Sequence, residues 1–183
     1  MTVEARAPLA EYAGRLADLA PAVLAEERPF LSQLNLRVRA GHEVVADVLG
    51  VPLPEPCTFA AGAGDVLWLG PDEYLVIDAP EGTEAALREA VAVGAVTDVS
   101  AQRTAVHLAG PAARDVLAHG CAIDLHPSVS PPGTCVQTLF ARTGIILMVR
   151  EAGEYTVLVR QSFAPYFAAW LADAAVEYRE EAP

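Results

Sequence analysis

The chain of 183 residues contains no lysine, since all twelve of its basic residues are arginine. Lysine is the residue of Schiff-base chemistry, of the phosphate-binding P-loop and of the amine general base. Arginine cannot replace it in these roles because the guanidinium stays protonated. The absence of lysine therefore excludes all three mechanisms.

Positive charge is scarce overall, with 24 acidic residues against 12 basic ones and a formal net charge of −12. A nucleic-acid partner requires a cationic surface that neutralises phosphates. We therefore predict no nucleic-acid partner. An acidic excess of this kind is typical of a protein that charge repulsion keeps in solution.

Long hydrophobic runs are also missing. A membrane span needs about 20 consecutive apolar residues, whereas the run at residues 145–149 has the length of a strand. The N-terminus lacks the apolar core of a signal peptide, and the three cysteines are an odd number. These features predict a cytoplasmic chain with reduced cysteines and no membrane partner.

Motifs of catalysis and cofactor binding are lacking as well. Ser100, Asp98 and His107 are the residue types of a hydrolase triad, but Ser100 has no G-x-S-x-G turn to expose its hydroxyl. Residues 62–64 (Gly-Ala-Gly) are followed by an extended apolar run instead of a helix that could face a pyrophosphate. We predict no catalytic and no cofactor-binding residue in this chain.

His119, Cys121 and His126 are residue types that bind zinc. Their spacing, H-x-C-x4-H, matches no tetrahedral pattern, and a fourth ligand would have to come from Cys135 or elsewhere. We predict no metal site, with the histidines at the surface or hydrogen-bonded and Cys121 buried. Cys135 begins an apolar strand, so we expect it to be buried and unreactive.

Apolar periodicity predicts the helices and strands. Strands are expected at residues 34–39, 57–60, 66–69, 74–77, 97–109, 135–141, 145–150 and 155–160. Helices are expected at residues 8–20, 42–49, 83–94 and 162–174, with a short helix from Pro111 to Gly120. Thr83 and Ser162 are the expected N-caps, and Gly120 is expected to end its helix in the left-handed conformation. Residues 22–30 are predicted to be a linker, and Asp72 and Glu73 an exposed pair at a turn.

Short turns between adjacent strands favour antiparallel or mixed sheets with packed helices, which is an α+β fold. The two halves of the chain are loosely alike, which suggests two related sheet units. We expect an N-terminal helix and linker at residues 1–29, whose packing the sequence leaves open. A single domain at residues 30–176 and a charged tail at residues 177–183 complete the division.

Arginines lie along the predicted strands of this acidic chain, at Arg37, Arg103, Arg142 and Arg160. The planar guanidinium pairs with carboxylates in two-pronged contacts and keeps its charge at interfaces. We take Arg103 and Arg142 as candidates for interface or structural pairing. The alternative for all four is a solvated strand face.

Five segments, covering most of residues 30–174, resemble in the same order the gamma subunit of heterotetrameric sarcosine oxidase. They are FLSQLNLRV, LWLGPDEYLVI, VTDVSAQRTAVHLAGPAARDVLAHGCAIDLHP, QTLFARTGIILM and RQSFAPYFAAWLADA. The resemblance implies a fold similar to the folate-binding domain of aminomethyltransferase, the T-protein of glycine cleavage, with its two-unit arrangement. It also implies assembly with an alpha subunit and, in the complex, with beta and delta subunits.

The resemblance places FAD, FMN, NAD, zinc and tetrahydrofolate in the other subunits and none in this chain. The family complex oxidatively demethylates sarcosine to glycine, reduces oxygen to hydrogen peroxide and passes the one-carbon unit to tetrahydrofolate. We therefore expect an accessory subunit for structure or assembly, which is not catalytic by itself. A standalone folate-binding or one-carbon transfer domain is the alternative, as is a gamma-like subunit of a related multisubunit amine dehydrogenase.

Overall fold

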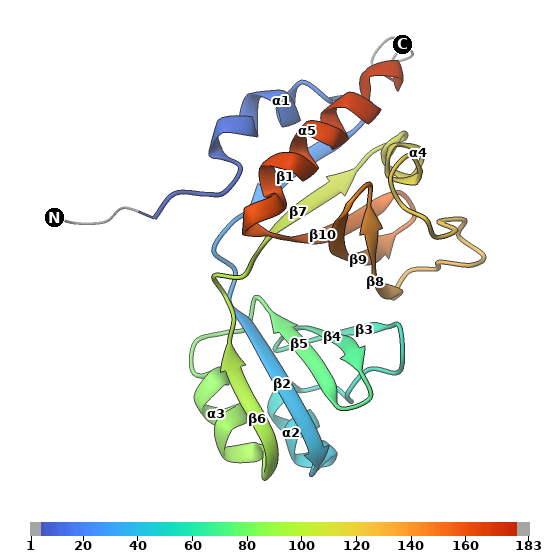
Figure 1. Cartoon of the computed structure of the whole chain (residues 1–183). Helices are drawn as coiled ribbons and strands as arrows, with labels where there is room; N and C mark the ends of the chain where they lie inside the picture. The colour runs from blue at the N-terminus through green and yellow to red at the C-terminus, as the bar shows by residue number, and fades with distance from the viewer. Residues whose placement is uncertain (1–4, 179–183) are drawn as a thin grey trace, which may run out of the picture. The chain divides into compact units, whose positions relative to one another are not determined.

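A computed structural model describes residues 5–178, and the chain divides into two compact units (Figure 1). Unit 1 contains Arg103–Pro132 and the described parts of Met1–Phe30 and Gln137–Pro183; unit 2 contains Leu31–Gln102 and Gly133–Val136. Each unit carries an antiparallel sheet with helices, so the predicted α+β class is confirmed. No helix within residues 5–178 has the length and hydrophobicity of a membrane span.

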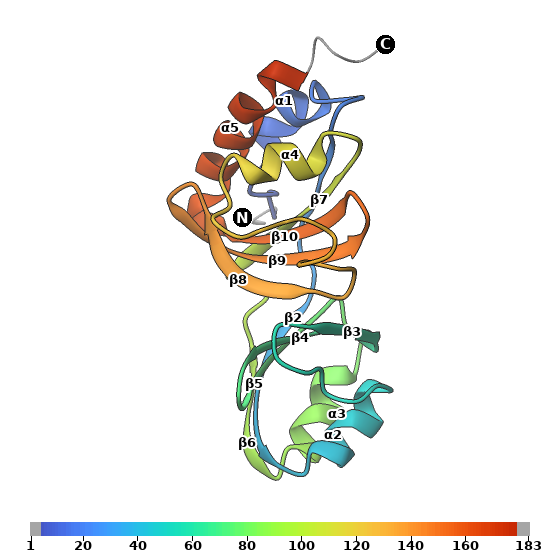
Figure 2. The same cartoon turned by 90° about the vertical axis from the view of Figure 1, so that its right-hand side faces the viewer.

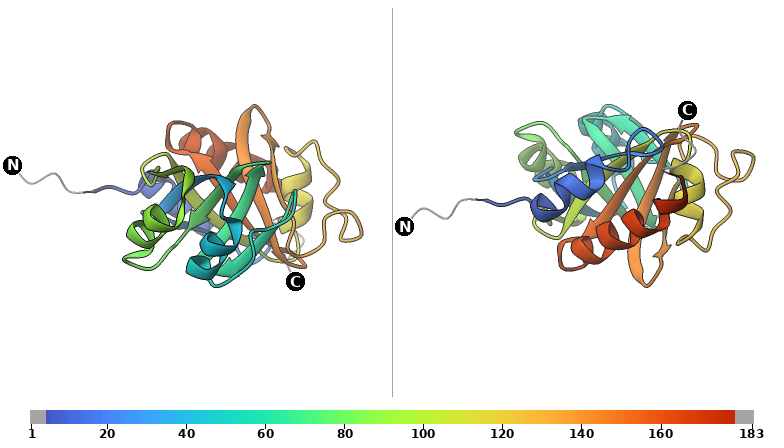
Figure 3. Two further views of the ribbon diagram at one scale, coloured as in Figure 1. Left: turned by 90° about the horizontal axis from the view of Figure 1, so that it is seen from below. Right: turned by 90° about the horizontal axis from the view of Figure 1, so that it is seen from above.

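Unit 1 is built on a five-stranded sheet. In sheet order its strands are β1 (Leu24–Arg28), β7 (Arg103–Ala109), β10 (Glu154–Arg160), β9 (Thr143–Glu151) and β8 (Cys135–Phe140, of which the first two residues belong to unit 2). Its helices are η1 (Ala10–Tyr12), α1 (Ala13–Ala17), α4 (Ala113–Ala118), η2 (Gln161–Phe163), α5 (Ala164–Ala174) and η3 (Val176–Tyr178). Helices α1 and α5 lie side by side, and α4 and α5 cover the same side of the sheet (Figures 2 and 3). The tail predicted at residues 177–183 lies outside the described residues beyond residue 178.

Unit 2 carries two helices on one face of its own five-stranded sheet. In sheet order its strands are β3 (Phe59–Gly62), β4 (Gly64–Gly70), β5 (Glu73–Ile77), β2 (Gln33–Ala40) and β6 (Val93–Asp98); its helices are α2 (His42–Leu49) and α3 (Thr83–Ala90). Leu34, Leu36 and Val38 alternate along β2 and are buried against Val45 and Leu49 of α2. Each such burial stabilises the fold by about 1.5–3 kcal/mol. The apolar residues whose spacing predicted β2 and α2 thus pack together in one core.

The helix ends differ from the predictions. Thr83 is the first residue of α3, whose N-cap is the left-handed Gly82, and its side chain makes no capping hydrogen bond. Ser162 lies inside η2, because α5 begins only at Ala164. Pro111 precedes α4 by two residues, in the turn that leads into the helix. Helix α3 also ends at Ala90, before the predicted end near Gly94, because β6 already begins at Val93.

The single extended stretch predicted at residues 97–109 is wrong, because β6 and β7 are separated by a turn. The Asp98 carboxylate accepts hydrogen bonds from the Ser100 backbone N–H (2.8 Å) and hydroxyl (2.6 Å). An aspartate that bonds to the backbone two residues on is typical of a turn. The chain crosses from unit 2 to unit 1 directly after this turn, between Gln102 and Arg103.

The linker predicted at residues 22–30 is also wrong, because these residues contain β1. This edge strand pairs antiparallel with β7, in a register that places Leu24 opposite Ala109 and Arg28 opposite Ala105. Its charged residues have low strand propensity, so the sequence pattern did not indicate a strand. Charged residues are nevertheless common on edge strands, because they oppose aggregation. The predicted helix at residues 8–20 is realised as η1 and α1, and Leu16 on its apolar stripe is buried.

The Glu27 carboxylate of β1 ties three segments of unit 1 together. It accepts a hydrogen bond from the Thr104 hydroxyl of β7 (2.7 Å) and from the backbone N–H of Leu9 (3.1 Å to each carboxylate oxygen). Thr104 and Leu9 are each 1% exposed. Removing an acceptor from buried donors costs more than the bond itself contributes, because the donors lose water as well.

Gly120 does not take the predicted left-handed conformation. An added Cβ there would lie 2.6 Å from Cδ2 of Phe140 and 3.1 Å from the Ala141 nitrogen. The Phe140 ring is fully buried, with its centroid 5.0 Å from that of Phe167 and 5.6 Å from that of Trp170. The glycine is therefore required by close packing after α4.

We predict that Gly120→Ala lowers the free energy of unfolding by about 2 kcal/mol, because the fully buried Phe140 ring would have to shift to admit the added methyl group. Urea denaturation followed by circular dichroism measures this. Gly144→Ala is the matched control, since a Cβ there meets nothing within 4 Å. Equal stabilities of the two variants would contradict the packing explanation.

We predict that Glu27→Ala destabilises the fold by about 2 kcal/mol, because it leaves two buried donors without their acceptor. Glu26→Ala, on the exposed neighbouring residue of the same strand, should change the stability by less than about 0.5 kcal/mol. Thermal and urea denaturation of both variants test this difference. A Glu27 effect as small as that of Glu26 would show that the carboxylate does not hold the three segments.

Candidate functional site

The three residues of the conceivable hydrolase triad serve other purposes in the structure. The Ser100 hydroxyl donates to Asp98 (2.6 Å) and accepts from the Gln33 backbone N–H (2.9 Å). Hydrogen bonds from the Ser100 hydroxyl and backbone N–H lower the pKa of Asp98 below its ordinary value. His107 belongs to unit 1, where its Nε2 lies 3.9 Å from a Glu154 carboxylate oxygen. Ser100 and Asp98 therefore fix the turn and the start of β2.

The histidines and cysteines considered as zinc ligands are engaged locally. His119 Nε2 lies 3.0 Å from the Tyr178 hydroxyl, and His126 Nδ1 lies 2.7 Å from the Ser128 hydroxyl. Burial raises the pKa of Cys121 to about 11, which disfavours the thiolate that would bind a metal. Within residues 5–178, no three His, Cys, Asp or Glu side chains are grouped to hold a metal ion. The interpretation of both histidines as hydrogen-bonded groups and of Cys121 and Cys135 as buried is confirmed.

Asp72 and Glu73, expected to be an exposed pair, are partly buried in an ion-pair network. Arg37 reaches both carboxylates (2.9 Å to Asp72 and 2.8 Å to Glu73), and Arg39 adds a second contact to Asp72 at 3.2 Å. The Asn35 amide donates to Glu73 at 2.8 Å. Hydrogen bonds from Arg39 and Arg37 lower the pKa of Asp72. Arg37 is therefore engaged within unit 2.

The two arginines named as interface candidates differ in exposure. Arg103 begins β7, is half-buried and lies opposite Arg160 of β10. Arg142 is exposed in the turn between β8 and β9 and forms no ion pair with any side chain that the structure describes.

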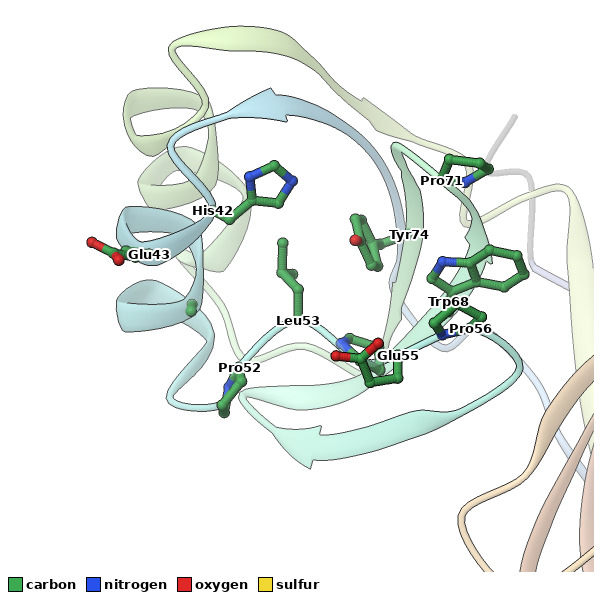
Figure 4. Close-up of a pocket in the computed structure, with 11 residues that line it drawn as sticks. His42, Glu43, Pro52, Leu53, Glu55, Pro56, Trp68, Pro71 and Tyr74 are labelled. Carbon is green, nitrogen blue, oxygen red and sulfur yellow. The ribbon is translucent and has the colours of Figure 1, made fainter.

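A cavity of about 450 Å³ opens on unit 2, and sequence reasoning missed it (Figure 4). Its walls come from α2, from the proline-rich segment after it, from Trp68 and from the turn before β5. The lining residues are His42, Glu43, Ala46, Pro52, Leu53, Pro54, Glu55, Pro56, Trp68, Pro71 and Tyr74. Trp68 and Tyr74 are opposite each other in the pairing of β4 with β5, so both rings belong to one face of the sheet. The alternating prolines at 52, 54 and 56 are the sequence signal that could have located this wall.

Tyr74 is the most buried polar residue among those that line this cavity. It is 6% exposed, and its hydroxyl makes no hydrogen bond with any residue between 5 and 178. Burial raises the pKa of Tyr74, and the negative charges of Glu55 and Asp72 raise it further. The phenol is therefore a neutral group with an unused donor and acceptor.

Unit 1 has a cavity of about 420 Å³, beside the start of α4 and the turn between β9 and β10. Arg114, which lines it, pairs with the neighbouring Asp115 at 3.2 Å. The rest of the wall includes prolines, glycines, the Glu151 side chain and the buried Tyr155. The cavity on unit 2 has two aromatic side chains, Trp68 and Tyr74, where this one has Tyr155 alone, so it is the stronger candidate.

Comparison with known protein families shows to which family this chain belongs. The model of the sarcosine oxidase gamma subunit family matches residues 39–177. The chain belongs to this family. It is similar to the sarcosine oxidase gamma subunits of an Arthrobacter species (37% identical, covering 94% of this chain and 91% of the relative) and of Corynebacterium strain P-1 (35%, covering 96% and 92%).

Two solved structures are similar to this gamma-family chain. It is similar to a chain of the heterotetrameric sarcosine oxidase from Corynebacterium sp. U-96 in complex with pyrrole 2-carboxylate, with 34% identity and a TM-score of 0.89 over 96% of each chain. Aminomethyltransferase T of the glycine cleavage system from Bartonella henselae matches at 12% identity and a TM-score of 0.67, over 92% of this chain and 49% of that one. The second likeness shows the fold alone and confirms the predicted T-protein-like arrangement.

We predict that Arg39→Gln raises the pKa of Asp72 towards 3.8, because it removes the larger of the two hydrogen bonds that lower it. The folded-state pKa of Asp72 lies below its unfolded value. Its ion pairs therefore stabilise the fold above about pH 4, and this stabilisation is lost as the pH falls through the lowered pKa.

An NMR titration of the side-chain carboxyl carbons measures the pKa of Asp72 directly. Arg160→Gln is the control, since Arg160 is exposed at the end of β10 in the other unit and should leave Asp72 unchanged. An Asp72 pKa that does not respond to Arg39→Gln would show that this contact is not formed in solution.

Proposed function

We propose that this chain is the accessory subunit of a heterotetrameric sarcosine oxidase, with a role in structure and assembly. One observation carries the proposal: the TM-score of 0.89 over 96% of both chains to a chain of the Corynebacterium sp. U-96 enzyme. A match over nearly the whole length of both chains supports a subunit of the same extent and the same role.

The engagement of the reactive side chains supports an accessory role. Ser100 and Asp98 bond to each other and to the start of β2, and Asp72 is bound by Arg37 and Arg39. Burial keeps Cys121 in its thiol form. Side chains engaged in this way stabilise the fold. We propose that the chain contributes to the complex through its surface, by contacts with the other subunits.

The proposed partners are the alpha subunit and, within the complex, the beta and delta subunits. The proposed reaction of the assembly is the oxidative demethylation of sarcosine to glycine, with reduction of oxygen to hydrogen peroxide and transfer of the one-carbon unit to tetrahydrofolate. FAD, FMN, NAD, zinc and tetrahydrofolate would be bound by the other subunits, and the complex would work in the cytoplasm.

Arg103 and Arg142 remain proposals as interface or structural residues. Exposed Arg142 is suited to contact a carboxylate of another subunit, since its guanidinium can form two parallel hydrogen bonds. Half-buried Arg103 at the start of β7 is better suited to a structural role.

We predict that this chain, when tagged and co-expressed with the alpha, beta and delta subunits, copurifies with them in equal amounts. The complete complex should form hydrogen peroxide when sarcosine is added, and a preparation without this chain should be unstable or inactive. Analytical ultracentrifugation and a peroxidase-coupled assay measure both properties.

Failure to associate with the other three subunits would overturn the proposal. If the chain alone then bound tetrahydrofolate, it would be a standalone folate-binding domain. Association with a complex that oxidises another N-methyl amine would instead make it a gamma-like subunit of a related dehydrogenase.

A further inference from the structure

The cavity on unit 2 combines flat aromatic and proline surfaces with one inward-facing carboxylate. Figure 4 shows the Glu55 side chain directed towards Tyr74, whereas Glu43 points away from the cavity on the outer side of α2. The Glu55 carboxylate forms no hydrogen bond or ion pair with any residue that the structure describes. Its negative charge reaches Tyr74, where it contributes to the raised pKa of the phenol.

The unused groups in this cavity define the chemistry of a ligand. The Tyr74 hydroxyl, on a side chain that is more than nine-tenths buried, and the Glu55 carboxylate can both accept hydrogen bonds. The face of Trp68 attracts a cation through its ring quadrupole. A planar cation with several N–H donors satisfies all three groups at once, whereas an anion would be repelled by Glu55.

We propose that this cavity receives an arginine side chain of a partner subunit, with its guanidinium against Trp68 and bonded to Glu55 and Tyr74. The identity of the partner rests on the function proposed above, while the preference for a guanidinium rests on the cavity alone. Guanidinium is more weakly hydrated than ammonium and stacks on aromatic rings, so arginine is favoured over lysine at such a site. Arginine and tryptophan are also the residues enriched at the centres of interfaces.

The arginines nearest to the cavity in sequence do not supply this guanidinium. Arg37 and Arg39 are held by Asp72 and Glu73 on the neighbouring turn. His42 is the one basic residue among those that line the cavity, and Figure 4 shows it at the end of α2, away from Glu55. With a net charge of −12, the chain complements a basic group on another protein.

A titration of the full-length chain with N-acetyl-arginine amide tests the chemistry of the cavity. The chain has two tryptophans, so NMR shows two indole N–H signals, which Trp68→Phe assigns. The Trp68 signal should shift on titration while that of Trp170 stays unchanged. N-acetyl-citrulline amide, which has the same shape without the charge, should bind at least tenfold more weakly.

Variants identify the groups that bind the probe. Glu55→Gln should weaken binding about tenfold, since it removes a charge-assisted hydrogen bond. Tyr74→Phe should weaken it about threefold or more, because it removes only the hydroxyl and keeps the buried ring. Glu43→Gln is the matched control and should bind as the wild type does. Far-UV circular dichroism and the melting temperature check that each variant is folded.

A second measurement tests the partner. The affinity of the tagged chain for the assembled alpha, beta and delta subunits, followed by surface plasmon resonance, should fall about tenfold for Glu55→Gln and severalfold for Tyr74→Phe, and not for Glu43→Gln. If the wild type associates and all three variants match it, the proposed partner arginine is wrong. If the probe leaves the Trp68 signal unchanged or binds no better than citrulline, the proposed cation preference is wrong.

The two proposals can fail separately. A wild-type chain that does not associate with the other subunits overturns the proposed function and the partner, while the probe titration still decides the chemistry of the cavity. A wild-type chain that associates without using Glu55 or Tyr74 overturns only the inference drawn from this cavity.

Discussion

The pairing of β1 with β7 is the constraint on which the rest of the chain depends. Most of unit 2, Leu31–Gln102, is inserted between these strands, so the β1 edge of the unit 1 sheet forms only when two segments far apart in sequence meet in register, with Arg28 opposite Ala105. Unit 2 closes its own ends in the same way, since Leu34 of β2 pairs with Asp98 of β6. The crossings after Phe30 and after Gln102 thus each follow a paired strand. Because the entropy of closing a loop grows only slowly with its length, a long insertion between paired ends is inexpensive.

Side-chain hydrogen bonds support the pairing of β1 with β7 and of β2 with β6. Glu27 joins β1 to Thr104 of β7, and Ser100 joins the end of β6 to Gln33 of β2. Polar residues that could suggest catalysis in the sequence therefore have a common structural role where the chain passes between the units. The same use explains why Asp98 keeps a lowered pKa without a catalytic partner, since its hydrogen bonds come from Ser100, two residues further on.

Sequence alone could predict the elements whose signal is local. Helix α2 and strand β2 have clear periodicities, and their boundaries were predicted to within one residue. Strand β1 could not be found in this way, because its residues gain strand structure only by pairing with β7. Gly120 carries the signal of a helix end, but the ring of Phe140 decides its role. The network of Arg37 with Asp72 and Glu73 and the cavity beside Trp68 both depend on the register of β5 with its neighbours, which no local pattern encodes.

The distribution of charge connects the fold to association. Much of the arginine content is used within the chain, since Arg37 and Arg39 pair with Asp72, Arg88 with Glu84, and Arg114 with Asp115. These arginines are already paired, and the excess of acidic residues gives the chain a net negative charge. A surface of one sign adds little to affinity by itself, but it steers a basic partner into place and disfavours partners of like charge. Affinity must come from a few desolvated contacts, and in unit 2 the cavity beside Trp68 is the place where aromatic surface and an unpaired carboxylate coincide.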